Sequence, residues 1–326
     1  MRPARTSSGL LLFLVLVLVA ACGGATPTSS DGATATTGPT GPTGAAVPET
    51  SFPVTITDDD GVSVTIESEP RRIVTFAPSA TEIVFALGLG DRLVGVSGPF
   101  DDYPAEATEI ERVGGAADFG VEPNVEQVVA LEPDLFLTIK GGDRWKGRLR
   151  ELGVPVVTLD ATDLDDLLGD IEVAGRITGA AAEAEALVAD LGSQAGEVEA
   201  ALSGVDPVSC FYETFYPPLY TVGPGTFIYD LLERAGCDPV TSSSDQQYPQ
   251  WSVEDLVDHG PDVYLVSSES GATPKAVTRR AGFEAIAAVE AGRVVAIESD
   301  LAERPGPRIV QGLRLIAQAL HPEAFA

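Results

Sequence analysis

Short, mostly apolar runs alternate with amphipathic stretches along most of this chain. Such runs lie at residues 72–76, 135–138 and 208–212, and in the stretches between them apolar residues recur at every third or fourth position. Short apolar runs are typical of buried strands, and the longer periodic stretches are typical of helices. Strands and helices that alternate over short turns predict an α/β fold with parallel sheets covered by helices on both faces.

Residues 52–67 have a different pattern. Apolar and polar residues alternate singly there, on either side of the sequence Asp58-Asp59-Asp60-Gly61. This alternation around an Asp-Gly pair predicts a β-hairpin, and it makes the acidic run a turn.

One longer pattern occurs twice. Residues 124–137 and 252–265 share Val, Glu, Val, Pro, Asp and Leu at equivalent positions, 128 residues apart and without an insertion. Each copy predicts a helix, a Pro-Asp turn and a buried strand, with Asn124 and Ser252 as the helix N-caps. A unit repeated once over this distance indicates two similar lobes rather than a solenoid. Two facing lobes form a cleft.

A long helix is predicted between the two copies. In residues 178–203 apolar positions follow a spacing of three and four, and two glycines weaken the helix by about 1 kcal/mol each without breaking it. We therefore predict an N-terminal lobe at 52–177 and a C-terminal lobe at 204–326, both Rossmann-like and joined by a single rigid helix. Such a connection predicts small opening and closing motions.

The N-terminus predicts export. Two arginines precede an apolar run that is too short to span a bilayer and that ends in small residues directly before Cys22. This pattern is similar to the lipobox of bacterial lipoproteins, and the alternative is an ordinary secretory signal with an incidental cysteine. We predict a lipoprotein signal peptide at 1–21, lipidation of Cys22, and a flexible tether at 22–51. The folded part would then be anchored at the extracytoplasmic face of the cell membrane.

Composition narrows the range of partners. The chain has 49 acidic and 20 basic residues and a formal net charge of −29, which disfavours binding to nucleic acid. Besides Cys22 it contains Cys210 and Cys237, which in an oxidising compartment form either a disulfide or two free buried thiols. His259 and His321 lie far from both cysteines in sequence, so we predict no metal site.

Sequence motifs give little support to catalysis. The chain contains neither G-x-S-x-G nor H-E-x-x-H, and Gly88-Leu89-Gly90 ends a predicted helix instead of beginning one. We therefore predict a protein that is not an enzyme and that carries no cofactor.

The loops after the predicted strands are the best candidates for a binding site. In open α/β sheets, ligands bind beyond the carboxyl ends of the strands. These loops are rich in aromatic residues, which suit a large, flat, partly apolar ligand, although Tyr103 and at least one of Phe215 and Tyr216 are expected to be ordinary core. The ligand-binding candidates are Phe100, Phe119, Lys140, Phe215, Tyr216, Tyr248, Trp251 and Arg304.

Several motifs occur together in order, at residues 72–82, 93–96, 102–104, 130–135 and 303–309. They resemble those of the substrate-binding proteins of ABC importers for vitamin B12, siderophores and haem, and most closely those of the vitamin B12-binding members. The resemblance covers about residues 70–322. It implies a monomer with two α/β lobes on one rigid helix, which delivers its ligand to a permease dimer and its ATPase.

The resemblance also implies roles for individual residues. In this family one surface glutamate of each lobe docks onto arginines of the permease, and the matching residues are Glu126 and Glu254. Either residue can also stabilise its helix start, by roughly 0.3–1 kcal/mol. A corrinoid is the first ligand implied, and a ferric siderophore or haem the second. Ile139 falls where the vitamin B12-binding members have Trp, and Arg304 and the tyrosines suit an anionic or iron-bearing ligand.

Overall fold

The computed structural model describes residues 50–114 and 122–326. The chain divides into two units, Met1–Ala46 and Val47–Ala326, and all the helices and strands of the described residues belong to the second. The predicted signal peptide, Cys22, the tether up to residue 49 and Phe119 lie outside the described residues. Within the described ranges no helix has both the length and the apolar character needed to cross a membrane.

The N-terminal lobe is built on a parallel sheet of four strands in the order β4-β3-β5-β6. Every residue of β3 and β5 is buried, as in strands that helices cover on both faces. The strands are β3 (Ile73–Phe76), β4 (Leu93–Gly95), β5 (Leu135–Thr138) and β6 (Val156–Thr158). The helices are α1 (Pro78–Ala86), η1 (Gly90–Arg92), η2 (Ala105–Glu109), α2 (Val125–Ala130), α3 (Asp143–Glu151) and α4 (Leu164–Thr178).

The C-terminal lobe has a second sheet, with strand order β11-β10-β7-β8 and with β9 also paired to β7. Only β8 pairs antiparallel within the described sheet. The strands are β7 (Val208–Phe215), β8 (Tyr220–Thr221), β9 (Cys237–Pro239), β10 (Val263–Ser267) and β11 (Val294–Ile297). The helices are α6 (Phe227–Arg234), α7 (Val253–His259), η3 (Ser268–Ser270), α8 (Pro274–Val277), η4 (Phe283–Ala285), α9 (Ala287–Glu290), α10 (Ser299–Ala302), α11 (Ile309–Leu320) and η5 (Pro322–Phe325).

The two copies of the repeat have the same structure. The side chain of Asn124 accepts a hydrogen bond from the backbone of Gln127 at the start of α2, and Ser252 accepts one from Asp255 at the start of α7, as predicted. In each copy the aspartate of the Pro-Asp turn joins its strand to the neighbouring one. The backbone N–H of Asp134 donates to the carbonyl of Arg72 at 3.0 Å, and that of Asp262 donates to the carbonyl of Ser209 at 3.0 Å.

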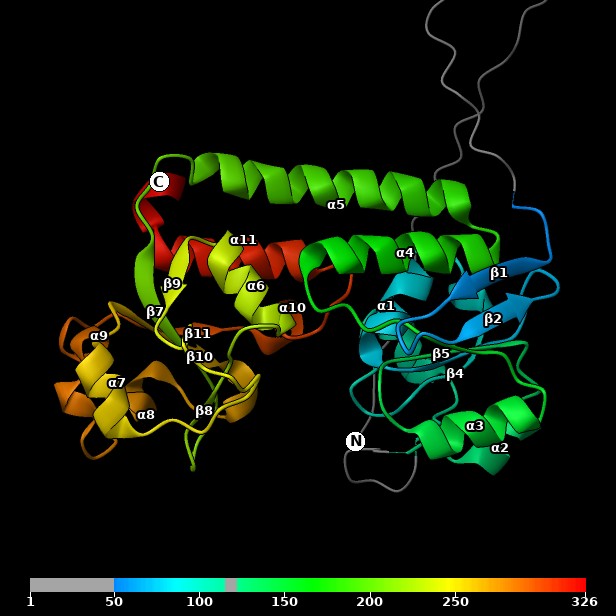
Figure 1. Cartoon of the computed structure of the whole chain (residues 1–326), viewed down its shortest axis with the longest axis horizontal. Helices are drawn as coiled ribbons and strands as arrows, with labels where there is room; N and C mark the ends of the chain where they lie inside the picture. The colour runs from blue at the N-terminus through cyan, green and yellow to red at the C-terminus, as the bar shows by residue number, and fades with distance from the viewer. Residues whose placement is uncertain (1–49, 115–121) are drawn as a thin grey trace, which may run out of the picture. The chain divides into compact units, whose positions relative to one another are not determined.

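Helix α5 (Ala181–Ala201) packs against α4 of the N-terminal lobe and α11 of the C-terminal lobe (Figure 1). The crossing of α4 and α5 depends on Gly175, because a Cβ atom at this position would collide with Ala184. One continuous apolar cluster runs through these helices, with Leu137 in the first lobe, Leu191 in α5 and Leu313 in the second lobe. The two lobes therefore share part of their core.

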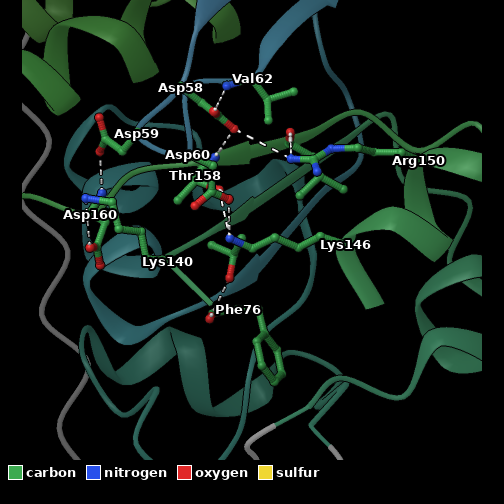
Figure 2. A network of polar contacts seen from close by, with 12 residues as sticks. Asp58, Asp59, Asp60, Val62, Phe76, Lys140, Lys146, Arg150, Thr158 and Asp160 are labelled. Carbon is green, nitrogen blue, oxygen red and sulfur yellow. Dashed lines mark hydrogen bonds and ion pairs between the residues drawn. The ribbon is translucent and has the colours of Figure 1, made fainter. Parts of the chain in front are cut away.

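The hairpin of β1 (Val54–Thr57) and β2 (Ser63–Ile66) is antiparallel, as predicted. Its turn is attached to the N-terminal lobe by the three aspartates of the acidic run (Figure 2). Asp58 accepts from the backbone N–H of Thr158 at 3.1 Å, and Asp60 accepts from the Lys146 ammonium at 2.7 Å. The acidic run forms the predicted turn, and its carboxylates also bind the hairpin to the lobe.

Lys146 on α3 is the centre of this attachment. Its side chain is fully buried, and its ammonium also donates to the hydroxyl of Thr158 at 2.9 Å. Burial works to raise the pKa of Asp60, but the hydrogen bonds from Lys146 and Thr158 and the nearby positive charges lower it overall. The buried ammonium is therefore paired with an ionised carboxylate.

The sequence left open whether Cys210 and Cys237 are bonded, and in the structure they form a disulfide. Their Cα atoms are 5.8 Å apart on the neighbouring strands β7 and β9. Strand β9 was not predicted, because it is only three residues long and ends in a proline.

Asp170 on α4 is a buried carboxyl group close to the hairpin turn, with 7% of its surface exposed. Burial, and then the charge of Asp59 and a hydrogen bond with it, raise the pKa of Asp170 from 3.8 to about 8. Between these two pKa values the folded chain binds more protons at this site than the unfolded chain. The free energy of unfolding therefore falls as pH rises through this window.

We expect Asp170→Asn to flatten this decline, because the amide keeps the shape of the side chain and does not ionise. Urea unfolding at about pH 5 and about pH 9 would measure it, with a smaller stability loss in the variant than in the wild type. The exposed Glu172 lies on the same helix, and Glu172→Gln should leave the wild-type decline unchanged. Equal declines in the wild type and Asp170→Asn would contradict the role of Asp170.

Candidate ligand-binding cleft

Two hollows lie side by side between the lobes, at the carboxyl ends of the strands. The first, here the Phe100 chamber, has a volume of about 370 Å³. The second, here the Tyr248 chamber, has a volume of about 400 Å³. The Phe100 chamber is lined by Pro78, Phe100, Asp102, Ser268, Glu269, Ser299, Asp300 and Arg304. The Tyr248 chamber is lined by Ala77, Pro78, Ser79, Ile139, Asp160, Ala161, Thr162, Gly225, Thr226, Phe227, Ile228, Gln247, Tyr248, Glu303, Arg304 and Pro305.

Each chamber takes its walls from both lobes. The loops after β3, β4, β5 and β6 supply one side, and segments of the C-terminal lobe, including the residues after β10 and β11, supply the other. This is the position at which open α/β sheets bind ligands, because the loops that follow parallel strands all emerge at the same edge. Together the chambers form an open cleft with polar and apolar walls.

Two aromatic rings are exposed in the cleft. Phe100 of the N-terminal lobe has 41% of its surface accessible and Tyr248 of the C-terminal lobe has 56%, and each lines one chamber. Ile139, which lines the Tyr248 chamber, is 40% exposed. Exposed rings on opposite walls offer a ligand apolar faces without closing the cleft.

Arg304 lies in the wall of both chambers. Its guanidinium makes an ion pair of 3.1 Å with Asp102 of the other lobe and one of 2.6 Å with Asp300, one helical turn before it. The first of these pairs crosses from lobe to lobe. Because it lines both chambers, Arg304 lies between them. Its positive charge is already paired with two protein carboxylates.

Glu303, directly before Arg304 in the chain, is a cleft residue that the sequence-based candidates did not include. Its carboxylate accepts a hydrogen bond of 2.7 Å from the hydroxyl of Tyr212 on β7. Burial is the main cause that raises the pKa of Glu303, and hydrogen bonds from Ser267 and Tyr212 partly oppose it. The same hydrogen bond helps to raise the pKa of Tyr212, whose burial is the larger cause.

Lys140 lies beside the Tyr248 chamber but is not part of its lining. Its ammonium is 3.6 Å from the carboxylate of Asp160, which does line it. The backbone N–H of Asp160 in turn donates to Asp59 of the hairpin turn at 2.5 Å (Figure 2). The hairpin therefore holds one loop of the cleft wall in place.

The other predicted candidates lie elsewhere in the C-terminal lobe. Phe215, at the end of β7, is half-exposed but lines neither chamber. Tyr216 stacks against the guanidinium of Arg280, 3.9 Å from its ring centre. Trp251 packs against Phe211 in an apolar cluster that also contains Leu256 of α7. Their participation in ligand binding remains a prediction.

A buried network holds Tyr216 in this position. Arg280 donates to both carboxylate oxygens of Glu213, at 2.5 and 2.8 Å, and Tyr264 donates to the same carboxylate. Because Glu213 is fully buried, its charge needs these partners. The network fixes Arg280, and Arg280 fixes the ring of Tyr216.

A second contact between the lobes lies behind the cleft. Arg308 donates to both carboxylate oxygens of Glu82 on α1, at 2.9 and 2.6 Å, and Glu82 is only 3% exposed. Burial raises the pKa of Glu82, and Arg308 opposes this by hydrogen bonding and charge. Arg308 also stacks on Tyr103, 3.9 Å from its ring centre. Tyr103 is 46% exposed and belongs to this contact, so the prediction that it is ordinary core is wrong.

The predicted docking residues lie away from these chambers. Glu126 is exposed in the first turn of α2, and Glu254 is exposed in the first turn of α7. Neither lines either chamber. Within residues 50–114 and 122–326, no group of three or more His, Cys, Asp or Glu side chains is arranged to hold a metal ion.

Comparison with known proteins points to one family. A family model described as periplasmic binding protein matches residues 73–301. The chain is 35% identical to YvrC of Bacillus subtilis, an ABC transporter substrate-binding lipoprotein, over 84% of this chain and 87% of that protein. It is 33% identical to a cobalamin-binding protein of Halobacterium salinarum, over 83% of this chain and 75% of that protein.

The fold is also similar to that of solved structures. The crystal structure of an ABC-type Fe3+-hydroxamate transport system from Saccharomonospora viridis superposes with a TM-score of 0.69 and 27% sequence identity. The alignment covers 82% of this chain and 99% of that one.

The buried pair behind the cleft gives a test of how the lobes are held together. We expect Arg308→Met to lower the free energy of unfolding by about 3–5 kcal/mol, because it leaves the carboxyl group of Glu82 buried without a partner. Arg314 on α11 makes an ion pair of 2.9 Å with Glu197 that is largely exposed on both sides, so Arg314→Met is a matched control. The control should change the free energy by about 0–1 kcal/mol.

Urea unfolding of both variants measures the difference, and Glu82→Leu combined with Arg308→Met should recover part of the loss. An effect of Arg308→Met no larger than that of the control would show that the buried pair does not hold the lobes.

Proposed function

This chain belongs to the periplasmic binding protein family, and we propose that it is the non-enzymatic substrate-binding protein of an ABC importer that captures a corrinoid in the cleft between its lobes. The observation that carries the proposal is the cleft itself, with exposed rings of Phe100 and Tyr248 on opposite lobes. A large ligand that fills both chambers contacts both rings at once. Apolar faces with a few convergent polar groups suit such a ligand.

The similarity to a cobalamin-binding protein over most of both chains supports a corrinoid as the first ligand. A ferric siderophore is the second candidate, because a structure with 27% sequence identity and a similar fold comes from an Fe3+-hydroxamate transport system. Haem is a further alternative with less support from the cleft. Ligand binding by the predicted residues Lys140, Phe215, Tyr216 and Trp251 would require the cleft to extend beyond the two chambers.

The proposal includes a place in the cell. The similarity to the lipoprotein YvrC supports lipid attachment at Cys22 and a location at the extracytoplasmic face of the membrane. Residues 22–51 would then tether the folded part within reach of the permease, and several acyl chains would be needed for stable anchoring. The protein would act there as a monomer.

Delivery would use the two copies of the repeat. Each lobe presents an exposed carboxylate in the first turn of a helix, Glu126 on α2 and Glu254 on α7, in equivalent local structure. Two equivalent acidic helix starts match a permease dimer that offers one basic site in each half. Because neither glutamate lines a chamber, docking and ligand binding should be separable by mutation.

Ligand binding can be tested by titrating the full chain with cyanocobalamin and following the bound fraction by equilibrium dialysis. We expect Tyr248→Ala to weaken binding by roughly tenfold or more, because an aromatic face is lost, and Tyr248→Phe to weaken it by less than about threefold. Leu152 is a similarly exposed apolar residue outside the cleft, and Leu152→Ala should have no effect. Absence of cyanocobalamin binding by the wild type would exclude a corrinoid.

Delivery can be tested in cells that depend on this importer. We expect the double charge reversal Glu126→Arg with Glu254→Arg to abolish uptake and to leave ligand affinity unchanged, because it replaces attraction to permease arginines by repulsion. Glu172 on α4 and Glu290 on α9 are exposed glutamates, one in each lobe, and the same reversals there are the control. Normal uptake by the Glu126/Glu254 variant would exclude these residues as the docking pair.

A further inference from the structure

The walls of the cleft carry a strong excess of negative charge. Among the described residues that line the two chambers, five have carboxylate side chains and one has a basic side chain. The carboxylates belong to Asp102, Asp160, Glu269, Asp300 and Glu303, and the basic residue is Arg304. The formal net charge of the whole chain, −29, adds to the same field.

The positive groups of the cleft are already paired. Arg304 is only 15% exposed and lies within 3.1 Å of Asp102 and 2.6 Å of Asp300. Lys140, at the edge of the Tyr248 chamber, lies 3.6 Å from Asp160. An anionic ligand that recruited either cation would have to displace a protein carboxylate and leave that carboxylate unpaired. Such an exchange gains little attraction and adds repulsion.

Two of the five carboxylates make no ion pair with a described residue. Glu269 is exposed in the wall of the Phe100 chamber, and Glu303 is mostly buried in the wall of the Tyr248 chamber. Glu303 is held by the hydroxyl of Tyr212. A ligand that approaches these two residues meets hydrogen-bond acceptors and negative charge, which favour amide N–H and ammonium groups over carboxylates and phenolates.

We infer that the cleft selects ligands without net negative charge, namely neutral or cationic metal complexes whose periphery offers N–H donors, and that it rejects complexes with free carboxylates or catecholates. This inference rests on the proposed function only in taking the cleft as the ligand site. It places neutral corrinoids and ferric hydroxamates among the accepted ligands. Haem, with its two propionates, and ferric tricatecholates are among the rejected ones.

The test is a comparison of four probes with the full chain in uncharged detergent at low ionic strength. They are neutral cyanocobalamin, a cationic ferric trihydroxamate, haemin and an anionic ferric tricatecholate. At least one of the first two is expected to bind roughly 100-fold more tightly than either anion.

Binding of the ferric trihydroxamate without cyanocobalamin would exclude the corrinoid proposal and support the charge selection. Haemin or the tricatecholate binding as tightly as both non-anionic probes would overturn the charge selection and leave the carrier function standing. Binding of none of the four would overturn both.

A pair of variants separates the cleft charges from the charge of the whole protein. Glu269→Gln combined with Glu303→Gln should strengthen haemin binding by roughly tenfold or more, because two negative charges leave the cleft while its shape is kept. Glu172→Gln combined with Glu290→Gln makes the same change in net charge outside the chambers and should have less than about a twofold effect. If the double variant folds poorly, Glu269→Gln alone tests whether loss of a cleft charge strengthens haemin binding, because Glu269 is exposed and its replacement does not disturb the core. Equal gains in the cleft variant and the control would overturn selection by the cleft.

Discussion

The distance between the two lobes is fixed by an apolar core that they share. Leu137 in the first lobe, Leu191 in α5 and Leu313 in the second lobe belong to one continuous cluster, so opening the cleft widely would expose apolar surface. The buried pair of Glu82 and Arg308 adds a directional contact between the lobes. Helix α5, at about 1.5 Å per residue, spans roughly 30 Å without a kink-forming proline. These contacts oppose wide opening and set the width of the cleft in this structure, and the small motions predicted from the sequence remain a prediction.

Much of this architecture could be predicted from the sequence because its signals are local. Buried strands such as β3 and β5 are short apolar runs, and the two N-caps, Asn124 and Ser252, stand directly before their helices. The contacts that form the cleft are different. Glu82 and Arg308 are 226 residues apart in the chain, and nothing in the sequence near either of them indicates the other.

The aromatic candidates show the same limit more closely. Tyr248 and Trp251 are three residues apart, yet Tyr248 lines the cleft and Trp251 packs against Phe211 in a separate apolar cluster. Composition predicts that a loop carries aromatic residues, but the path of the loop decides which way each one points. Glu303 shows a related limit, since an acidic residue in an acidic chain gives no signal in the sequence until its burial is known. Lipidation of Cys22 and docking by Glu126 and Glu254 remain predictions.

The two helix starts belong to the repeat, whereas none of the residues that line the chambers does, and this separation has an evolutionary consequence. The chamber walls come mostly from loops after strands, whereas Glu126 and Glu254 stand in the first turns of helices α2 and α7. If Glu126 and Glu254 dock the permease as proposed, substitutions in the loops can change the ligand without altering the docking surface. Descendants of one ancestral carrier could in this way acquire new cargo while keeping the same membrane machinery.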